Sequence, residues 1–174
     1  MEKQLLTVSI YTENFVGLLN RVTAIFTKRH VNIESITASK SEIENVHRYT
    51  IVVRESETLI KKIVKVLEKQ IDVIGAFYHS EDQTIYQEIS LYKVNVENVN
   101  NSKFKEIITT NHAKIVAVEK EFVVIEKSGT KEETDKLYNE LNPFGLMQFV
   151  RSGRVVITKQ KMKISEILNN NKNN

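Results

Sequence analysis

Two asparagines and a glycine flank one short amphipathic segment near the N-terminus, and their chemistry suits the binding of a small polar molecule. In ENFVGLLNRVTAIFTKRHVNIES (13–35), Asn14 and Gly17 come before a helical pattern and Asn32 comes after it. An asparagine amide both donates and accepts hydrogen bonds, and the first N–H groups of a helix attract a carboxylate. Together these groups suit a zwitterion. With three aliphatic side chains included, the candidate contacts are Asn14, Gly17, Leu18, Leu19, Asn32 and Ile33.

A plainer interpretation accounts for the same residues without a ligand. Asn14 is a frequent type of helix cap, Gly17 fits a tight turn, and Asn32 fits the start of a strand after a turn. Both interpretations stay open on the residues alone, and caps and turns are the commoner use of these types.

Residues for catalysis or metal binding are not grouped in this sequence. The four histidines are scattered, no cysteine is present, and no phosphate-binding loop, dinucleotide fingerprint or nucleophile turn occurs. His79, Glu81 and Asp82 are close together, but they fall in a polar linker and are expected to be solvated. We therefore expect no catalytic residues and no metal site. The absence of cysteine also fits a reducing compartment.

Charge and hydropathy argue against nucleic acid and membrane as partners. The net charge of +3 is spread along the chain, and the aromatic pattern of RNA-binding ferredoxin-like domains is missing. No window has the roughly 18 consecutive apolar residues that span a bilayer, and the N-terminus does not have the composition of a secretory signal. The expectation is a soluble, cytoplasmic protein.

Two halves of the chain repeat the same order of predicted elements. In the first half, LLTVSIY (5–11) alternates as a half-buried strand, and Ser56 is a plausible N-cap of the second helix. In the second half, Thr130 and Glu133 form a capping-box pattern, and Pro143 ends the helix that follows. The predicted strands are 5–11, 31–39, 47–53, 71–79, 85–96, 113–119 and 121–127, with 147–151 and 154–158 as a final strand pair or one strand with a break. The predicted helices follow Gly17, Ser56 and Thr130, and a further short helix is predicted at 102–110.

This order predicts an α+β protein with two ferredoxin-like βαββαβ domains. The expected boundaries are residues 4–80 and 85–160, followed by a disordered, asparagine-rich tail at 161–174. Each half is near the size at which a single core is marginal, so we expect the chain to form an oligomer.

The N-terminal segment resembles the ACT domain at the start of the small, regulatory subunit of acetolactate synthase. The shared pattern is N-x-x-G-x-L-x-R-V…F-x-x-R…N-I-E-S, and its ending is the part most specific to this family. The resemblance continues at QEISLYKV (87–94), AKIVAVE (113–119) and FVRSGRVVIT (149–158). The matching residues of the N-terminal pattern are Asn14, Gly17, Leu19, Arg21, Val22, Phe26, Arg29, Asn32, Ile33, Glu34 and Ser35.

The resemblance implies a regulatory role and an effector site shared by two chains. ACT domains of this family pair side by side, and a branched-chain amino acid, typically valine, binds between them as a feedback inhibitor. The contacts then fall on Asn14, Gly17 and Leu18 of one chain and on Asn32 and Ile33 of its neighbour. The resemblance also implies docking on a large catalytic subunit, whose activity the small subunit raises. Thiamine diphosphate, magnesium and FAD belong to that partner and not to this chain.

Three residues depart from the family pattern, and a second function class stays open. Phe15 and Val16 stand where polar residues or a proline usually precede the glycine, and Leu18 stands where alanine or valine is common. These side chains are expected to narrow the effector pocket. The alternative function is a free-standing tandem ACT-like amino-acid sensor that controls another enzyme or a transcription factor.

Overall fold

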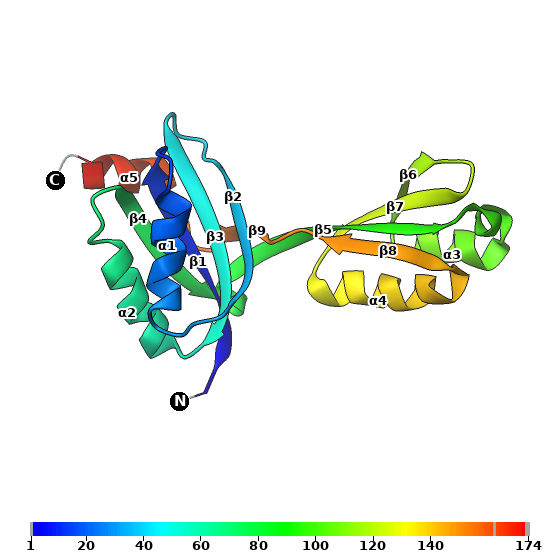
Figure 1. Ribbon diagram of the computed structural model, residues 1–174, viewed down its shortest axis with the longest axis horizontal. Helices are drawn as coiled ribbons and strands as arrows, with labels where there is room; N and C mark the ends of the chain where they lie inside the picture. Colours follow the sequence, from blue (N-terminus) through cyan, green and yellow to red (C-terminus); the bar gives the residue numbers. More distant parts are fainter. Residues whose placement is uncertain (1, 162, 173–174) are drawn as a thin grey trace. The chain divides into compact units, whose positions relative to one another are not determined.

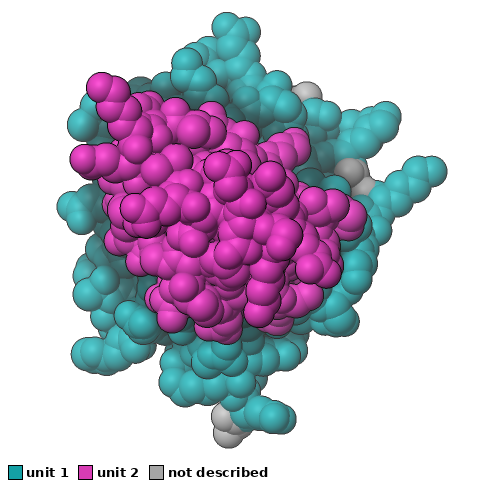
Figure 2. All heavy atoms as spheres, turned by 90° about the vertical axis from the view of Figure 1, so that its right-hand side faces the viewer, with its two compact units in different colours: residues 1–85, 154–174 teal, residues 86–153 magenta. Residues whose placement is uncertain are grey.

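The computed structural model describes residues 2–161 and 163–172, and the chain divides into two compact units. Unit 1 comprises residues 1–85 and 154–174, and unit 2 comprises residues 86–153 (Figure 2). The predicted α+β class with two ferredoxin-like βαββαβ arrangements is confirmed. Residues 154–160 fall within the predicted second domain, 85–160, and group with unit 1 by their contacts.

Unit 1 contains a four-stranded antiparallel sheet with two helices on one face (Figure 1). The sheet order β2-β3-β1-β4 places β1 in the interior and leaves β2 at an edge. Residues of β1 alternate, so that Leu6, Val8 and Ile10 pack against the helices in the main core. The elements are β1 (Gln4–Glu13), α1 (Leu18–Thr27), β2 (Ile33–Lys40), β3 (Val46–Glu55), α2 (Glu57–Leu67) and β4 (Val73–Ser80).

The second face of this sheet is also covered, because the C-terminal part of the chain returns to it. β9 (Val155–Thr158) and α5 (Ile164–Lys172) both belong to unit 1. Leu168 of α5 is 1% exposed and shares a small cluster with Tyr11. As a result β1 is buried on both faces, whereas the alternation of LLTVSIY predicted a half-buried strand.

The tail therefore differs from its predicted disorder over most of its length. Residues 164–172 form α5, whose side chains reach the sheet through Ile164 and Leu168. Met162, Asn173 and Asn174, which fall under the same prediction, lie outside the described residues.

Unit 2 repeats the topology, with its strands in the order β6-β7-β5-β8. Its core includes Tyr92, Phe104 and Leu137, all fully buried. The hydroxyl of Tyr92 donates a hydrogen bond of 2.7 Å to the carbonyl of Thr134. The elements are β5 (Thr84–Asn95), α3 (Ser102–Thr110), β6 (Lys114–Val118), β7 (Phe122–Gly129), α4 (Lys131–Leu141) and β8 (Leu146–Arg151), with short 3₁₀ turns η1 (Glu81–Gln83), η2 (Val96–Asn100) and η3 (Asn142–Phe144).

The two units also share a detail at the end of their first helices. His30 after α1 and His112 after α3 have φ angles of 54° and 51°. Val31 N–H donates to the Phe26 carbonyl, five residues back, and the equivalent bond after α3 has the same spacing. A left-handed residue with this bond is the Schellman ending of a helix, and histidine tolerates the left-handed region better than most residues.

Candidate functional site

The N-terminus of α1 is open to an anion. Gly17 is its N-cap residue, with φ 88° and ψ −4°. Among the described residues, no side chain accepts a hydrogen bond from the first N–H groups of α1, and its first turn contains no acid. Unpaired N–H groups at the positive end of a helix dipole favour a carboxylate. This end of α1 therefore keeps the property that the candidate site requires.

Gly17 is required by its backbone conformation and not by crowding within the chain. An ideal Cβ built at this position meets no atom within 4 Å, but the φ of 88° lies in the left-handed region. The tight-turn interpretation of Gly17 is therefore correct, and it is compatible with a ligand at the same place.

Asn14 does not cap α1, so the capping interpretation of this residue is wrong. Its side chain is exposed, and its amide has no hydrogen-bond partner within the part of the chain that the structure describes. It lines a hollow of about 400 Å³ whose other wall is the β2–β3 turn, residues 40–47. An exposed amide beside an uncapped helix remains available to a ligand.

The leucines of the candidate site are placed differently from one another. Leu18 is 2% exposed and is buried within its own chain, so its side chain is not accessible to a ligand, and its N–H donates to the Phe15 carbonyl at 3.5 Å. Leu19 is 44% exposed, and its side chain is accessible. The expectation that both leucines form an aliphatic wall therefore needs correction for Leu18, because its position on the inner stripe of α1 directs it into the protein.

Phe15 and Val16 are the exposed apolar residues that the candidate set omitted. They are 60% and 102% exposed and lie between Asn14 and Gly17. Their signal in the sequence was two consecutive large apolar residues outside the helical period. Exposed apolar groups of this size beside a polar site are common where a second molecule binds.

Asn32 and Ile33 lie at the opposite end of α1 from Gly17. The ten residues of α1 span about 15 Å, and Asn32 follows the helix after a short turn. Asn32 is exposed and its amide has no partner among the described residues, while Ile33 is half-buried at the start of edge strand β2. One chain thus carries two half-sites at the two ends of one helix, and does not bring them together.

The described residues contain no group of three or more histidine and acidic side chains that could hold a metal ion. Within the same part of the chain, none of the helices has both the length and the apolar character that a membrane crossing needs.

Comparison with known proteins gives consistent matches over both units. A family model described as an AHAS small subunit-like ACT domain matches residues 8–75, and one described as the small subunit of acetolactate synthase matches residues 87–160. The acetolactate synthase small subunit of Mycolicibacterium smegmatis is 32% identical over 153 residues, covering 88% of this chain and 90% of the relative. That of Bacillus subtilis is 32% identical over 158 residues, covering 90% of this chain and 91% of the relative.

A solved structure supports the fold over nearly the same length. The crystal structure of the acetolactate synthase small subunit from Thermotoga maritima superposes with a TM-score of 0.82 at 24% identity. The match covers 91% of this chain and 99% of that one.

Proposed function

Because the chain belongs to the family of acetolactate synthase small subunits, we propose that it regulates a catalytic subunit in response to a branched-chain amino acid, with valine as the first candidate. It docks on the catalytic subunit and raises its activity, and the bound amino acid reverses this effect. The observation that carries the proposal is the uncapped N-terminus of α1 beside an exposed asparagine amide.

A pair of chains completes the effector site in this proposal. The two half-sites lie at opposite ends of α1, so a two-fold axis that sets two copies of α1 antiparallel brings the Gly17 end of one protomer to the Asn32 end of its partner. Edge strand β2 offers unpaired backbone groups for joining the sheets. Burial of exposed apolar residues favours such a pair; they include Phe15, Val16, Leu19 and Ile36.

Each part of the shared site has a distinct task toward the ligand. The N–H groups at the start of α1 receive the carboxylate, and the amides of Asn14 and the partner's Asn32 receive the ammonium group. Ile33 and Leu19 contact the branched side chain. Phe15 and Val16 narrow the entrance, so the site discriminates among amino acids by the size of the side chain.

Regulation then follows from the difference in the affinity of the ligand for different arrangements of the two protomers. A ligand that bridges two protomers binds fully in only one of their arrangements, and it shifts the equilibrium by its preference for that arrangement. Couplings of about 1–3 kcal/mol, or roughly 5- to 150-fold, are typical. In this proposal, the catalytic subunit binds thiamine diphosphate, magnesium and FAD, and this chain binds the amino-acid effector. Capture of the catalytic subunit by this chain separates the proposal from a free-standing amino-acid sensor.

Substitution of Gly17 tests the placement of the carboxylate. Gly17→Asp and Gly17→Asn have side chains of nearly equal size, and both residue types tolerate a left-handed backbone, so the pair differs mainly in charge. We expect Gly17→Asp to weaken valine binding at least tenfold relative to Gly17→Asn, because the added carboxylate repels that of the ligand. Calorimetry of the small subunit and inhibition of the reconstituted enzyme both measure this difference.

Additional amino acids and variants define the outcome. Leucine and isoleucine should bind to the same site as valine, whereas glutamate should not, and Asn14→Ala should weaken the response with activation of the catalytic subunit largely unchanged. Equal valine inhibition with the wild type and with Gly17→Asp would refute the placement.

A further inference from the structure

A cavity of about 290 Å³ lies in unit 1 on the sheet face away from α1 and α2. Its floor is formed by β1, β3 and β4, and its cover is formed by β9 and the start of α5. All of its lining residues belong to unit 1, and none belongs to the candidate effector site. The lining includes Ser9, Tyr11, Arg48, Phe77, His79 and Ile164.

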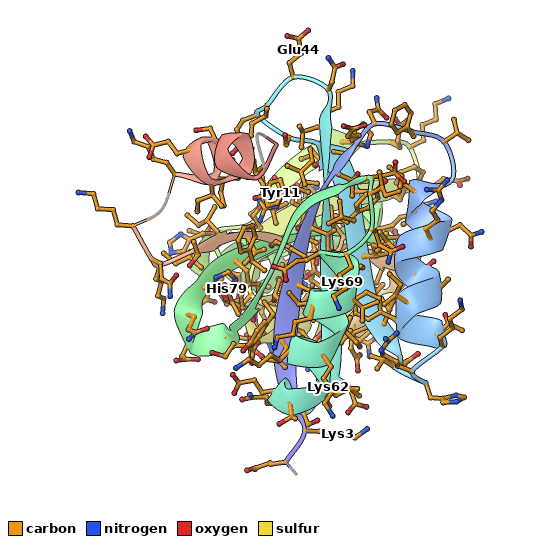
Figure 3. All side chains as sticks on the ribbon, turned by 90° about the vertical axis from the view of Figure 1, so that its left-hand side faces the viewer. Lys3, Tyr11, Glu44, Lys62, Lys69 and His79 are labelled. Atoms are coloured by element: carbon orange, nitrogen blue, oxygen red, sulfur yellow. The ribbon has the colours of Figure 1, made fainter. Side chains whose placement is uncertain are left out.

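Strand register explains why these side chains meet. Tyr11 pairs with Arg48 across β1 and β3, while Ser9 pairs with Phe77 across β1 and β4. Residues at these paired positions have side chains on the same face of the sheet. Tyr11 and His79 lie on the side of the sheet opposite α1, as Figure 3 shows.

Arg48 is the cation of this cavity, and its hydrogen bonding is incomplete. Its Nη2 donates to the Val156 carbonyl at 2.5 Å and lies 3.5 Å from Ser9 Oγ. Its guanidinium carbon lies 5.7 Å from the centre of the Tyr11 ring. The Nε–H is buried and has no hydrogen-bond partner among the described residues. An unsatisfied buried donor on a charged group is costly, and a bound anion would satisfy it.

The charge of the lining favours an anion with a single negative charge. Among the lining residues, Glu42 is the one acid; it is exposed to solvent, and Arg48 forms no ion pair with any described residue. Burial, and then the nearby charge of Arg48, lower the pKa of His79, so this histidine contributes a neutral imidazole at pH 7. One guanidinium without a second cation matches a carboxylate better than it matches a phosphate dianion.

We propose that this cavity is a second ligand site, which binds a small monocarboxylate with a short apolar chain. The carboxylate pairs with the Arg48 guanidinium, with Ser9 Oγ close by. The chain of the ligand lies against Phe77 and Ile164, whose apolar surfaces line the same space. A volume of about 290 Å³ is at the lower limit for ligand pockets, which selects a small molecule.

Ligand binding here is coupled to the C-terminal segment. Val156 and Ile164, which contact the cavity, come from the part of the chain that returns to unit 1. A ligand held between the sheet and this segment stabilises their association by mass action. The site lies on the other face of the sheet from α1, so its occupation does not depend on the effector site at the α1 ends.

Isovalerate is a suitable probe, because it has one carboxylate and a short branched chain. Its neutral isostere isovaleramide serves as the ligand control. The full-length chain is titrated with each compound and followed by NMR of the His79 imidazole and the Ile164 methyl groups, with calorimetry in parallel. We expect saturable binding of isovalerate and at least tenfold weaker binding of isovaleramide.

Arginine variants on one strand provide the matched comparison. Arg48→Gln removes the charge from the cavity, whereas Arg54→Gln removes an exposed charge from the same strand outside it. We expect Arg48→Gln to weaken isovalerate binding at least tenfold and Arg54→Gln to leave it unchanged. Ser9→Ala, a smaller change, should weaken it about threefold and is informative even if Arg48→Gln folds poorly.

Several results would overturn the proposal. They are the absence of saturable isovalerate binding, equal affinity for the amide, and unchanged affinity in a folded Arg48→Gln protein. Gly17→Asp separates this site from the effector site, because it should weaken valine binding and leave isovalerate binding intact. Loss of isovalerate binding in Gly17→Asp would show that the probe occupies the α1 site and would contradict the proposal.

Discussion

His79 lies on β4, and the burial of its face of the sheet changes how the imidazole titrates. Its pKa is lowered, first by desolvation and second by the charge of Arg48. In the unfolded chain the histidine titrates near 6.5. Between the folded and unfolded pKa values the unfolded state therefore binds more protons than the folded state, and the free energy of unfolding rises with pH. The contribution of His79 to the free energy of unfolding is fully present above the pKa of the unfolded state, and it is lost as the pH falls below that value.

The His79→Gln substitution tests this linkage. We expect the wild type to lose free energy of unfolding between pH 7 and pH 5, and the variant to lose less, because glutamine has no proton to bind. Urea unfolding at both pH values, followed by a probe in unit 1, measures the difference. Above pH 8 the slopes of the two proteins should agree, and an equal loss in both at low pH would assign the effect to other groups.

Several individual residues were predictable from the sequence because local geometry alone determines their role. The capping box of Thr130 and Glu133 is confirmed, with Thr130 N–H donating to Glu133 Oε2 at 2.7 Å and Glu133 N–H donating to Thr130 Oγ1 at 3.3 Å. Leu18 was not predictable in this way. Whether a leucine at the start of a helix faces a ligand or the core depends on the angle at which the helix packs.

At the scale of elements, the starts of α2 and α4 offer a direct comparison. Ser56 and Thr130 occupy the N-cap positions, but the Ser56 side chain makes no capping hydrogen bond. Loss of a working cap costs about 1 kcal/mol. Thr130→Ala should therefore lower the free energy of unfolding of unit 2 by about 1 kcal/mol, and Ser56→Ala should lower that of unit 1 by less.

Unfolding curves with one probe in each unit distinguish these two effects. Thr130→Ser keeps the hydroxyl and is the control, since serine caps a helix as well as threonine does. A loss in Thr130→Ser as large as that in Thr130→Ala would contradict the capping argument.

The sequence did not predict that both faces of β1 are buried or that α5 forms, because each feature depends on contact with the other and not on its local sequence pattern. The residues of β1 alternate between apolar and polar types, and the polar Thr7 and Ser9 do not indicate that their side of the sheet is buried as well. α5 is a nine-residue helix rich in asparagine, and such a segment is not stable alone. It forms where Leu168 packs on Tyr11 and close to Gly75, whose ideal Cβ would lie 2.9 Å from Leu168 Cδ2. Neither the sequence of the sheet strands nor the sequence of α5 indicates this contact by itself.

At the scale of the whole molecule, unit 1 is completed by residues from both ends of the chain. Residues 1–85 contain the ferredoxin-like order, but the cover of the second sheet face comes from β9 and α5. Without this cover, Tyr11 and Phe77 lose part of the surface that buries them. Unit 1 therefore contains the returning C-terminal segment in addition to the predicted domain of residues 4–80.

A fragment of residues 1–85 tests this dependence. We expect it to unfold at a lower denaturant concentration than unit 1 of the intact chain, because one sheet face is exposed to water. Addition of a peptide with residues 154–174 should restore stability in a concentration-dependent manner. A peptide with Leu168→Ala should restore less. Equal stability of the fragment and the intact unit would contradict the role of the returning segment.

The hydrogen bond of 2.9 Å from Lys159 N–H to the Gln83 carbonyl joins the residue just after β9 to the residue just before β5. Because the two chain crossings are neighbours there, residues 86–153 form an insert with one entrance and one exit at the same place. A short β-hairpin, or a foreign module whose termini are one strand spacing apart, could be grafted between them. In such a chimera, unit 1 would carry a different module in place of residues 86–153.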